Sequence, residues 1–204
     1  LAVSGVGPDR TGTFVAGPFS GSFRRDDTRL GIFDPLVERR SGAVSFDLVG
    51  PDIYGAITAD CTVRSLTLNA GPVSLEPEPT RLTCSIQHEG RVIPASLTAE
   101  TVREGAAGAF GRETRRGRIA LDRTVLTIRS EHKLQGSGLG LAAPAGYVFE
   151  ANGAAVGSVE ITGQPQIRFA AGSDPAVRRA VVAGALALGL MWDPATSALG
   201  REAG

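Results

Sequence analysis

The stretch that decides the fold is SDPAVRRAVVAGALALGLMW, residues 173–192. Its first two residues offer a capping oxygen, and Pro175 follows at the first helical position, where no backbone N–H is needed. Pro194 ends the helix, because a residue that precedes proline avoids the α region. The sequence therefore predicts one α-helix over about residues 175–192.

This helix is apolar on every side. From Ala180 to Trp192 it carries no charged or strongly polar side chain, and a helix that is apolar all round is buried all round. Its apolar part, about 13 residues, is too short for a bilayer, which needs about 20. Leu186 and Leu188 lie about 200° apart around the axis, so a helix on a flat sheet would expose one of them. We therefore expect both inside a closed sheet.

The rest of the chain consists of short extended runs separated by Gly, Pro, Asn and Asp. Asn152-Gly153 between two such runs predicts a hairpin, because both residues tolerate the positive φ of a type I′ turn. Asp122-Arg123 and residues 88–90 are further candidate turns. Pro77 and Pro79 argue against a central strand at that point, because proline donates no ladder hydrogen bond.

These elements predict a mainly β fold, a closed antiparallel β-barrel threaded by one hydrophobic C-terminal α-helix. We expect a flexible lead-in at residues 1–11, a single barrel domain at residues 12–194 and a tail at residues 195–204. A chain of 204 residues suits one such domain, since all-β barrels often reach this length undivided.

The order of the C-terminal elements resembles the tubby C-terminal-like superfamily, which includes the plant LURP-one-related proteins and the phospholipid scramblases. The matching elements are the Asn152-Gly153 hairpin, strands at residues 156–161 and 167–169, and the helix Pro175–Trp192. The resemblance covers about the last quarter of the chain and implies a twelve-stranded barrel around a hydrophobic helix. No motif here matches that family's lipid-binding or calcium-binding residues, so the resemblance implies no site residue.

Cys61 and Cys84 are the two cysteines, and each alternates with aliphatic residues on a predicted strand. Two buried free thiols and one disulfide both fit this pattern. We favour the disulfide, because the two strands are consecutive, and a disulfide implies the periplasm or the cell exterior. The sequence has no Cys/His cluster of the kind that binds a metal ion. The chain begins at Leu1, and we expect that a segment preceding it can anchor the protein to a membrane.

Charge excludes one class of partner and leaves another. The 21 basic and 21 acidic residues balance, so nucleic acid is not an expected partner. No apolar run reaches the length of a transmembrane segment. Arg178 and Arg179 stand at the helix start, where cations oppose the helix dipole. At the mouth of a barrel they are the candidate ligand-binding residues for an anionic lipid head group.

The sequence offers no catalytic motif. His88 lies in a predicted turn and His132 at a polar strand end, and both are expected at the surface. The glycine-rich residues 136–140 lack the strand–turn–helix context of a phosphate-binding loop, so no nucleotide or other cofactor is expected.

The first functional hypothesis is a non-enzymatic exported envelope domain that binds a lipid or a partner protein. The alternative is a hydrolase of envelope polymers with its site on the outside of the barrel. A third hypothesis, a lipocalin-like carrier with an empty barrel, leaves the apolar helix without a burial site. A pocket distinguishes the first hypothesis from the second, because an enzyme needs a cleft on the outside of the barrel with an acid or base of perturbed pKa.

Overall fold

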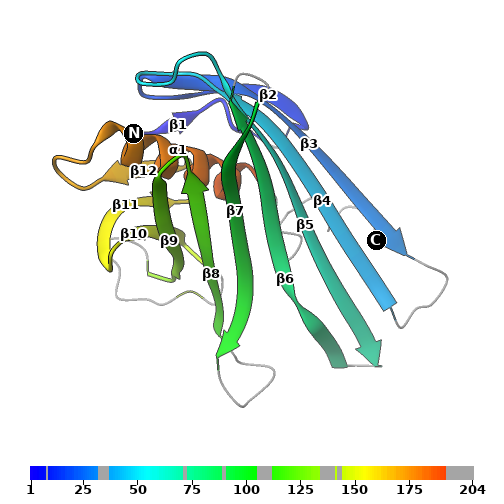
Figure 1. The fold of residues 1–204 in the computed structure, drawn as a ribbon. Coiled ribbons are helices and arrows are strands. Elements are labelled where there is room, and N and C mark those ends of the chain that lie inside the picture. The colour runs from blue at the N-terminus through cyan, green and yellow to red at the C-terminus, as the bar shows by residue number, and fades with distance from the viewer. Residues whose placement is uncertain are drawn as a thin grey trace.

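Twelve strands and one helix make up the described part of this computed structural model, which covers residues 1–7, 9–31, 37–70, 73–88, 91–104, 112–133, 141 and 144–191. The strands are β1 (Val3–Ser4), β2 (Thr11–Ala16), β3 (Phe19–Gly31), β4 (Val37–Leu48), β5 (Ile57–Ala70), β6 (Val73–His88), β7 (Arg91–Glu104), β8 (Arg112–Leu121), β9 (Thr124–Glu131), β10 (Gly146–Ala151), β11 (Ala154–Glu160) and β12 (Gln166–Phe169). They form one antiparallel sheet in chain order (Figure 1). The helix α1 spans Pro175–Leu190. Trp192 and the expected tail at residues 195–204 lie outside the described residues.

Tight turns explain the simple strand order. Asn152 (φ 51°) and Gly153 (φ 80°) connect β10 to β11, so the predicted hairpin is confirmed. Asp122 (φ 53°) takes the same left-handed conformation between β8 and β9. His88 pairs with Arg91 across the third predicted turn.

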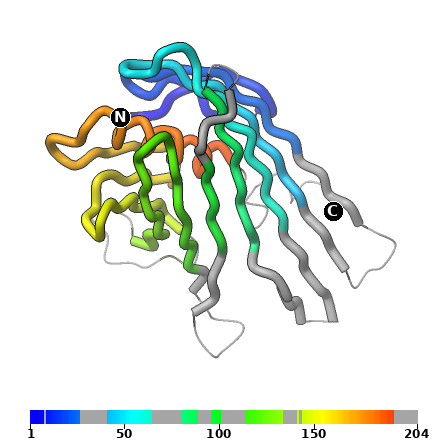
Figure 2. The backbone as a smooth tube through the Cα atoms, in the orientation of Figure 1, coloured from blue at the N-terminus to red at the C-terminus, as the bar shows by residue number. Residues whose placement is uncertain are grey.

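The first residues of the chain bring the two ends of the sheet together. Ala2 bridges Gln166, and the Val3 N–H donates to the Pro165 carbonyl at 2.8 Å. Figure 2 shows the N-terminus beside the orange segment that contains β12. Val3 is only 3% exposed. Residues 1–11, expected as a lead-in, thus contribute β1 and the contact that makes the barrel nearly closed.

Helix α1 packs inside the curve of this sheet. It contacts β4, β8, β9, β11 and β12. Leu186 is 2% and Leu188 is 7% exposed, so the predicted burial on opposite sides of the helix is confirmed. A Cβ atom on Gly157 of β11 would lie 2.8 Å from a methyl carbon of Val181, so this glycine permits the close approach of helix and wall.

The interpretation of Pro77 and Pro79 is wrong, because β6 runs through both of them. Two register shifts against β5 occur in this part of the strand, opposite residues 64–68. The described pairs between β6 and β7 begin only at Arg81. The prolines therefore occupy an irregular part of β6 outside its described ladder with β7, where a missing N–H is tolerated.

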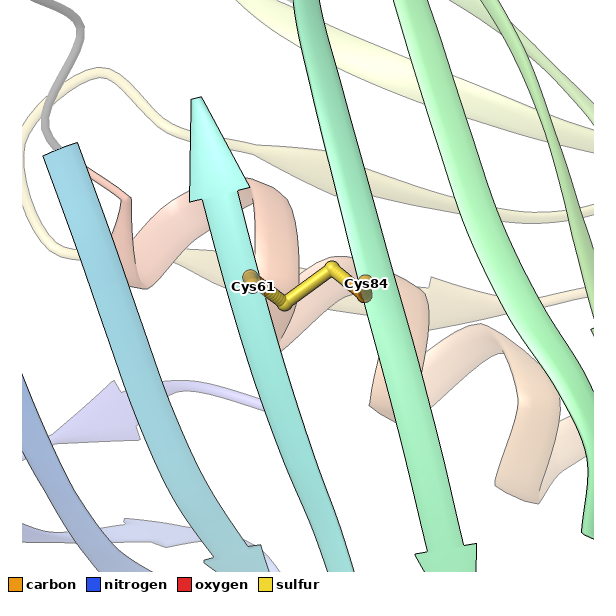
Figure 3. The surroundings of a disulfide bond; sticks show 2 residues. All are labelled: Cys61 and Cys84. Atoms are coloured by element: carbon orange, nitrogen blue, oxygen red, sulfur yellow. A yellow bond between two sulfur atoms is a disulfide. The ribbon is translucent and has the colours of Figure 1, made fainter. Parts of the chain in front are cut away.

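Cys61 and Cys84 form a disulfide between the neighbouring strands β5 and β6 (Figure 3). The two residues are directly opposite in the register, and each is 1% exposed. The structure therefore contains the disulfide that we favoured over two free thiols. A disulfide is compatible with a periplasmic or extracellular location. Within the described residues, no helix combines the length and apolarity that a membrane crossing requires.

Candidate functional site

Among the described residues, the interior of the barrel around α1 is filled by side chains of the protein itself. Phe14, Phe46 and Phe149 are fully buried in one core with Leu190 at the end of α1. This packing argues against the lipocalin-like hypothesis, because the described core around α1 holds side chains where a carrier would hold its ligand.

A buried arginine closes the C-terminal end of α1. Arg25 is 3% exposed, and its Nε donates to the Leu190 carbonyl at 2.6 Å. Its Nη1 donates to the Gly7 carbonyl at 2.7 Å. The guanidinium also lies 4.7 Å from the centre of the Phe23 ring. A cation at a helix C-terminus stabilises the helix dipole, so Arg25 acts in the fold.

His132 is buried, which corrects the expectation that it lies at the surface. It is 5% exposed, and its Nδ1 donates to the Leu141 carbonyl at 3.1 Å. In the neutral ring, Nε2 then accepts from the Ser130 hydroxyl, 3.0 Å away. The backbone N–H of Arg115 donates to the same hydroxyl oxygen at 2.9 Å. This contact was not predicted, although Ser130 lies near the end of β9 and His132 follows just beyond it, two residues along the chain.

The Ser130–His132 contact has the hydrogen-bond geometry of a nucleophile and its base. His132 is nevertheless closed off from solvent, and the neighbouring Tyr147 is 2% exposed. The groove described below has neither Ser130 nor His132 among its lining residues. In the described structure this contact therefore joins β9 to the Leu141 segment.

The loop between β4 and β5 presents an exposed aromatic side chain. Tyr54 is 83% exposed, the most of any large apolar residue in the described structure. The loop is nevertheless held in place, because Arg179 Nη1 donates to the Asp52 carbonyl at 2.9 Å and His88 Nε2 contacts the Tyr54 carbonyl. Asp52 (φ 61°) and Gly55 (φ 79°) bend the backbone here.

The structure places Arg178 and Arg179 near the start of α1, and Arg179 contacts this loop. Arg178 is exposed, and its Nε donates to the Ser173 carbonyl at 2.8 Å. Arg179 is mostly covered, with 21% of its side chain exposed, and its Nη2 lies 3.8 Å from the Asp122 carboxylate. Asp174 caps the helix through its Oδ1, which accepts from the Ala176 N–H at 2.7 Å. Arg179 therefore braces two loops, and Arg178 is the more accessible cation.

A groove of about 370 Å³ lies along the wall formed by β10 to β12 and the end of β9. We call it the outer groove. Its lining residues are Glu131, Lys133, Ala145, Gly146, Tyr147, Val148, Ser158, Val159, Glu160 and Arg168.

One carboxylate of the outer groove has a shifted pKa. Desolvation raises the pKa of Glu131, but backbone N–H groups of Lys133 and His132 and the guanidinium of Arg129 outweigh this and hold the pKa below its ordinary value. The hydrogen bond from Arg129 to Glu150 chiefly raises the pKa of Arg129. Glu131 is therefore ionised at neutral pH and is a poor general acid.

The described residues contain no group of three or more His, Cys, Asp or Glu placed to hold a metal ion. The fold and these surfaces define a nearly closed β-barrel built around a C-terminal helix. No family model, curated protein or solved structure matches the chain.

Proposed function

We propose that this chain is a non-enzymatic domain of the cell envelope, exported to the periplasm or cell exterior, that binds a partner protein through the end of the barrel around Tyr54. The observation that carries the proposal is the 83% exposure of Tyr54 on a loop fixed by Arg179 and His88. The buried Cys61–Cys84 disulfide supports export. The enclosed helix supports the resemblance to the tubby-like superfamily, which belongs to the same proposal.

A fixed, exposed tyrosine is suited to protein recognition. Tyrosine offers a large contact area at a small cost in side-chain entropy, and tyrosine and arginine are enriched among the residues that dominate binding energy. Here Arg179 holds the loop of Tyr54 through the Asp52 carbonyl, and the exposed Arg178 precedes Arg179 on α1. A loop ordered before binding loses less entropy when the partner arrives.

The charges at this end favour a protein over an anionic lipid. Arg179 already pairs with Asp122 and with the Asp52 carbonyl. Asp174, the helix cap, adds a carboxylate next to Arg178. An anionic membrane attracts uncompensated basic residues, and these carboxylates reduce that attraction. Binding of an anionic lipid by Arg178 and Arg179 is therefore the competing outcome of the test.

A hydrolase of envelope polymers is the second candidate. On the outside of the barrel, Glu131 and Glu160 border the outer groove, but Glu131 has a lowered pKa. The one observation in favour of hydrolysis is the contact between Ser130 and His132. A fluorophosphonate probe that labels Ser130 in the folded protein would support this candidate and contradict the non-enzymatic proposal.

The main test replaces Tyr54 by a photo-crosslinking phenylalanine derivative in cells that export the protein. Lys133, at the far end of β9 from the Asp122 turn, is the matched control position. We expect one protein adduct from position 54 and none from position 133. Arg179→Gln should diminish the adduct, because it releases the loop. A lipid adduct alone, or strong binding of the purified protein to anionic vesicles at low salt, would contradict the proposal.

A further inference from the structure

The outer groove has a regular arrangement of charge across three strands. Gly146 of β10 is opposite Glu131 on one side and Glu160 of β11 on the other. Two residues along, Val148 is opposite Ser158, and Ser158 is opposite Arg168 of β12. Gly146 thus stands between two carboxylate-bearing residues, and Ser158 stands between Val148 and a cation.

Strands β10 and β11 approach each other closely at Gly146. A Cβ atom at this position would lie 2.2 Å from the Val159 carbonyl oxygen and 3.0 Å from the Glu160 Cα. Both are backbone atoms of a neighbouring strand and cannot turn aside. Only glycine fits here, because the backbone of β11 lies against this position, and no side chain projects from it between Glu131 and Glu160.

The carboxylates of the groove are held in fixed positions. Glu131 Oε1 accepts from the backbone N–H groups of His132 and Lys133, at 3.1 and 3.2 Å. Glu160 Oε2 accepts from Arg168 Nη1 at 3.4 Å, and its Oε1 accepts from the Thr162 hydroxyl at 3.2 Å. A carboxylate has about four lone-pair sites, so each keeps acceptor capacity for a ligand.

The charges of the groove cancel. Glu131 and Glu160 contribute two negative charges, and Lys133 and Arg168 contribute two positive charges, so the lining has no net charge. The two carboxylates repel an anionic ligand, and the two cations repel a cationic ligand. A hydroxyl group both donates and accepts, so it can bond to either kind of side chain without a charge penalty.

We propose that the outer groove binds a short stretch of a neutral glycan. Its volume of about 370 Å³ suits a small ligand. Glu160 and Glu131 accept from sugar hydroxyls, Arg168 and Lys133 donate to them, and Ser158 does either. The one aromatic residue in the lining, Tyr147, has its ring in the core at 2% exposure. Recognition therefore depends on hydrogen bonds.

The test titrates the full chain with neutral tetrasaccharides (chitotetraose, cellotetraose and maltotetraose) and follows the backbone amides by NMR. The de-N-acetylated, cationic form of chitotetraose and an anionic oligogalacturonate are the charge controls. We expect at least one neutral probe to give saturable shifts at Gly146, Val148 and Ser158, and the charged probes to bind more weakly.

Two substitutions test the residues. Glu160→Gln should weaken the neutral probe about 10-fold or more, the usual effect of losing a hydrogen bond to a charged group. Glu150→Gln is the matched control, since Glu150 is on the neighbouring strand, pairs with Arg129 and does not line the groove. It should leave affinity unchanged.

No saturable shift with any neutral probe, tighter binding of a charged probe, or equal effects of Glu160→Gln and Glu150→Gln would overturn the proposal. An unchanged melting temperature identifies variants that are folded. Tyr54→Ala should not alter glycan binding, so this inference and the proposed partner site stand or fall separately.

Discussion

Two glycines of α1 should respond in opposite ways to the same substitution. A Cβ on Gly184 would lie 2.7 Å from Phe149 Cε1 and 3.4 Å from Ile119 Cδ1. On Gly189 the nearest atom would be 4.0 Å away, at Ile161 Cγ2. Phe149 and Ile119 are both 0% exposed, so the wall cannot move aside. We expect Gly184→Ala to destabilise the protein relative to Gly189→Ala.

The magnitude follows from two effects. Alanine gains about 1 kcal/mol over glycine inside any helix, and this gain applies equally to both positions. Overpacking a core costs about 1–3 kcal/mol, and this cost applies at Gly184 alone. Gly189→Ala should therefore be stabilising by up to about 1 kcal/mol. The difference between the variants should be about 1–3 kcal/mol, or about 2–12 °C in Tm for a domain of this size.

Urea unfolding followed by circular dichroism gives the free energy of unfolding of both variants. The double variant Gly184→Ala with Phe149→Leu should recover part of the loss, because the smaller residue makes room. Equal stabilities of the two single variants would refute the enclosed helix, since a helix with one side in water gains from alanine at either position.

Three further predictions concern polar and covalent contacts. Non-reduced mass spectrometry should recover Cys61 and Cys84 as one linked peptide pair, and reduction should lower stability by roughly 3 kcal/mol; two free thiols in oxidised protein would contradict this. Arg25→Met should lower the free energy of unfolding, measured in urea, by about 2–5 kcal/mol, because buried carbonyls lose a charged donor. Arg25→Lys should have a smaller effect than Arg25→Met. An Arg25→Met variant as stable as the natural protein would refute the capping role. The folded-state pKa of Glu131 is lowered, so its ionised form contributes stability above the ordinary value, and this is lost as pH falls through the folded value. The stability difference between the natural protein and Glu131→Gln should therefore shrink toward acid pH, and a difference that stays constant would contradict the shift.

The helix and the hairpins were predictable because their causes are local. The apolar circumference around Leu186 and Leu188 leaves a closed sheet as the one suitable environment within a single domain, and Asn152-Gly153 sets its own turn. The prolines of β6 misled, because the rule against them concerns a regular strand paired on both sides. Whether a strand is hydrogen-bonded on both sides depends on its neighbouring strands, so this cannot be predicted from the residues of the strand alone.

The buried polar residues could not be predicted, because their partners are backbone carbonyls. Arg25 donates to the Leu190 carbonyl and His132 to the Leu141 carbonyl. Every residue has a backbone carbonyl, so the sequence does not show which of them accepts a hydrogen bond. The Tyr54 loop was missed for a related reason: its anchor Arg179 lies 127 residues away. Arg178 and Arg179 were singled out for their place at the helix start, and the structure adds the loop that Arg179 holds.

The closure of the barrel by Ala2 and Gln166 also sets an order of assembly. A chain that is synthesised or exported from its N-terminus presents Ala2 first, but the partner strand and the core helix are among the last parts to appear. Until then the apolar inner face of the sheet lacks both β12, which closes it, and α1, which packs inside it. A chain truncated before β12 cannot complete either, so it should be cleared by proteases. The last residues of α1 thus decide whether the twelve strands that precede it survive.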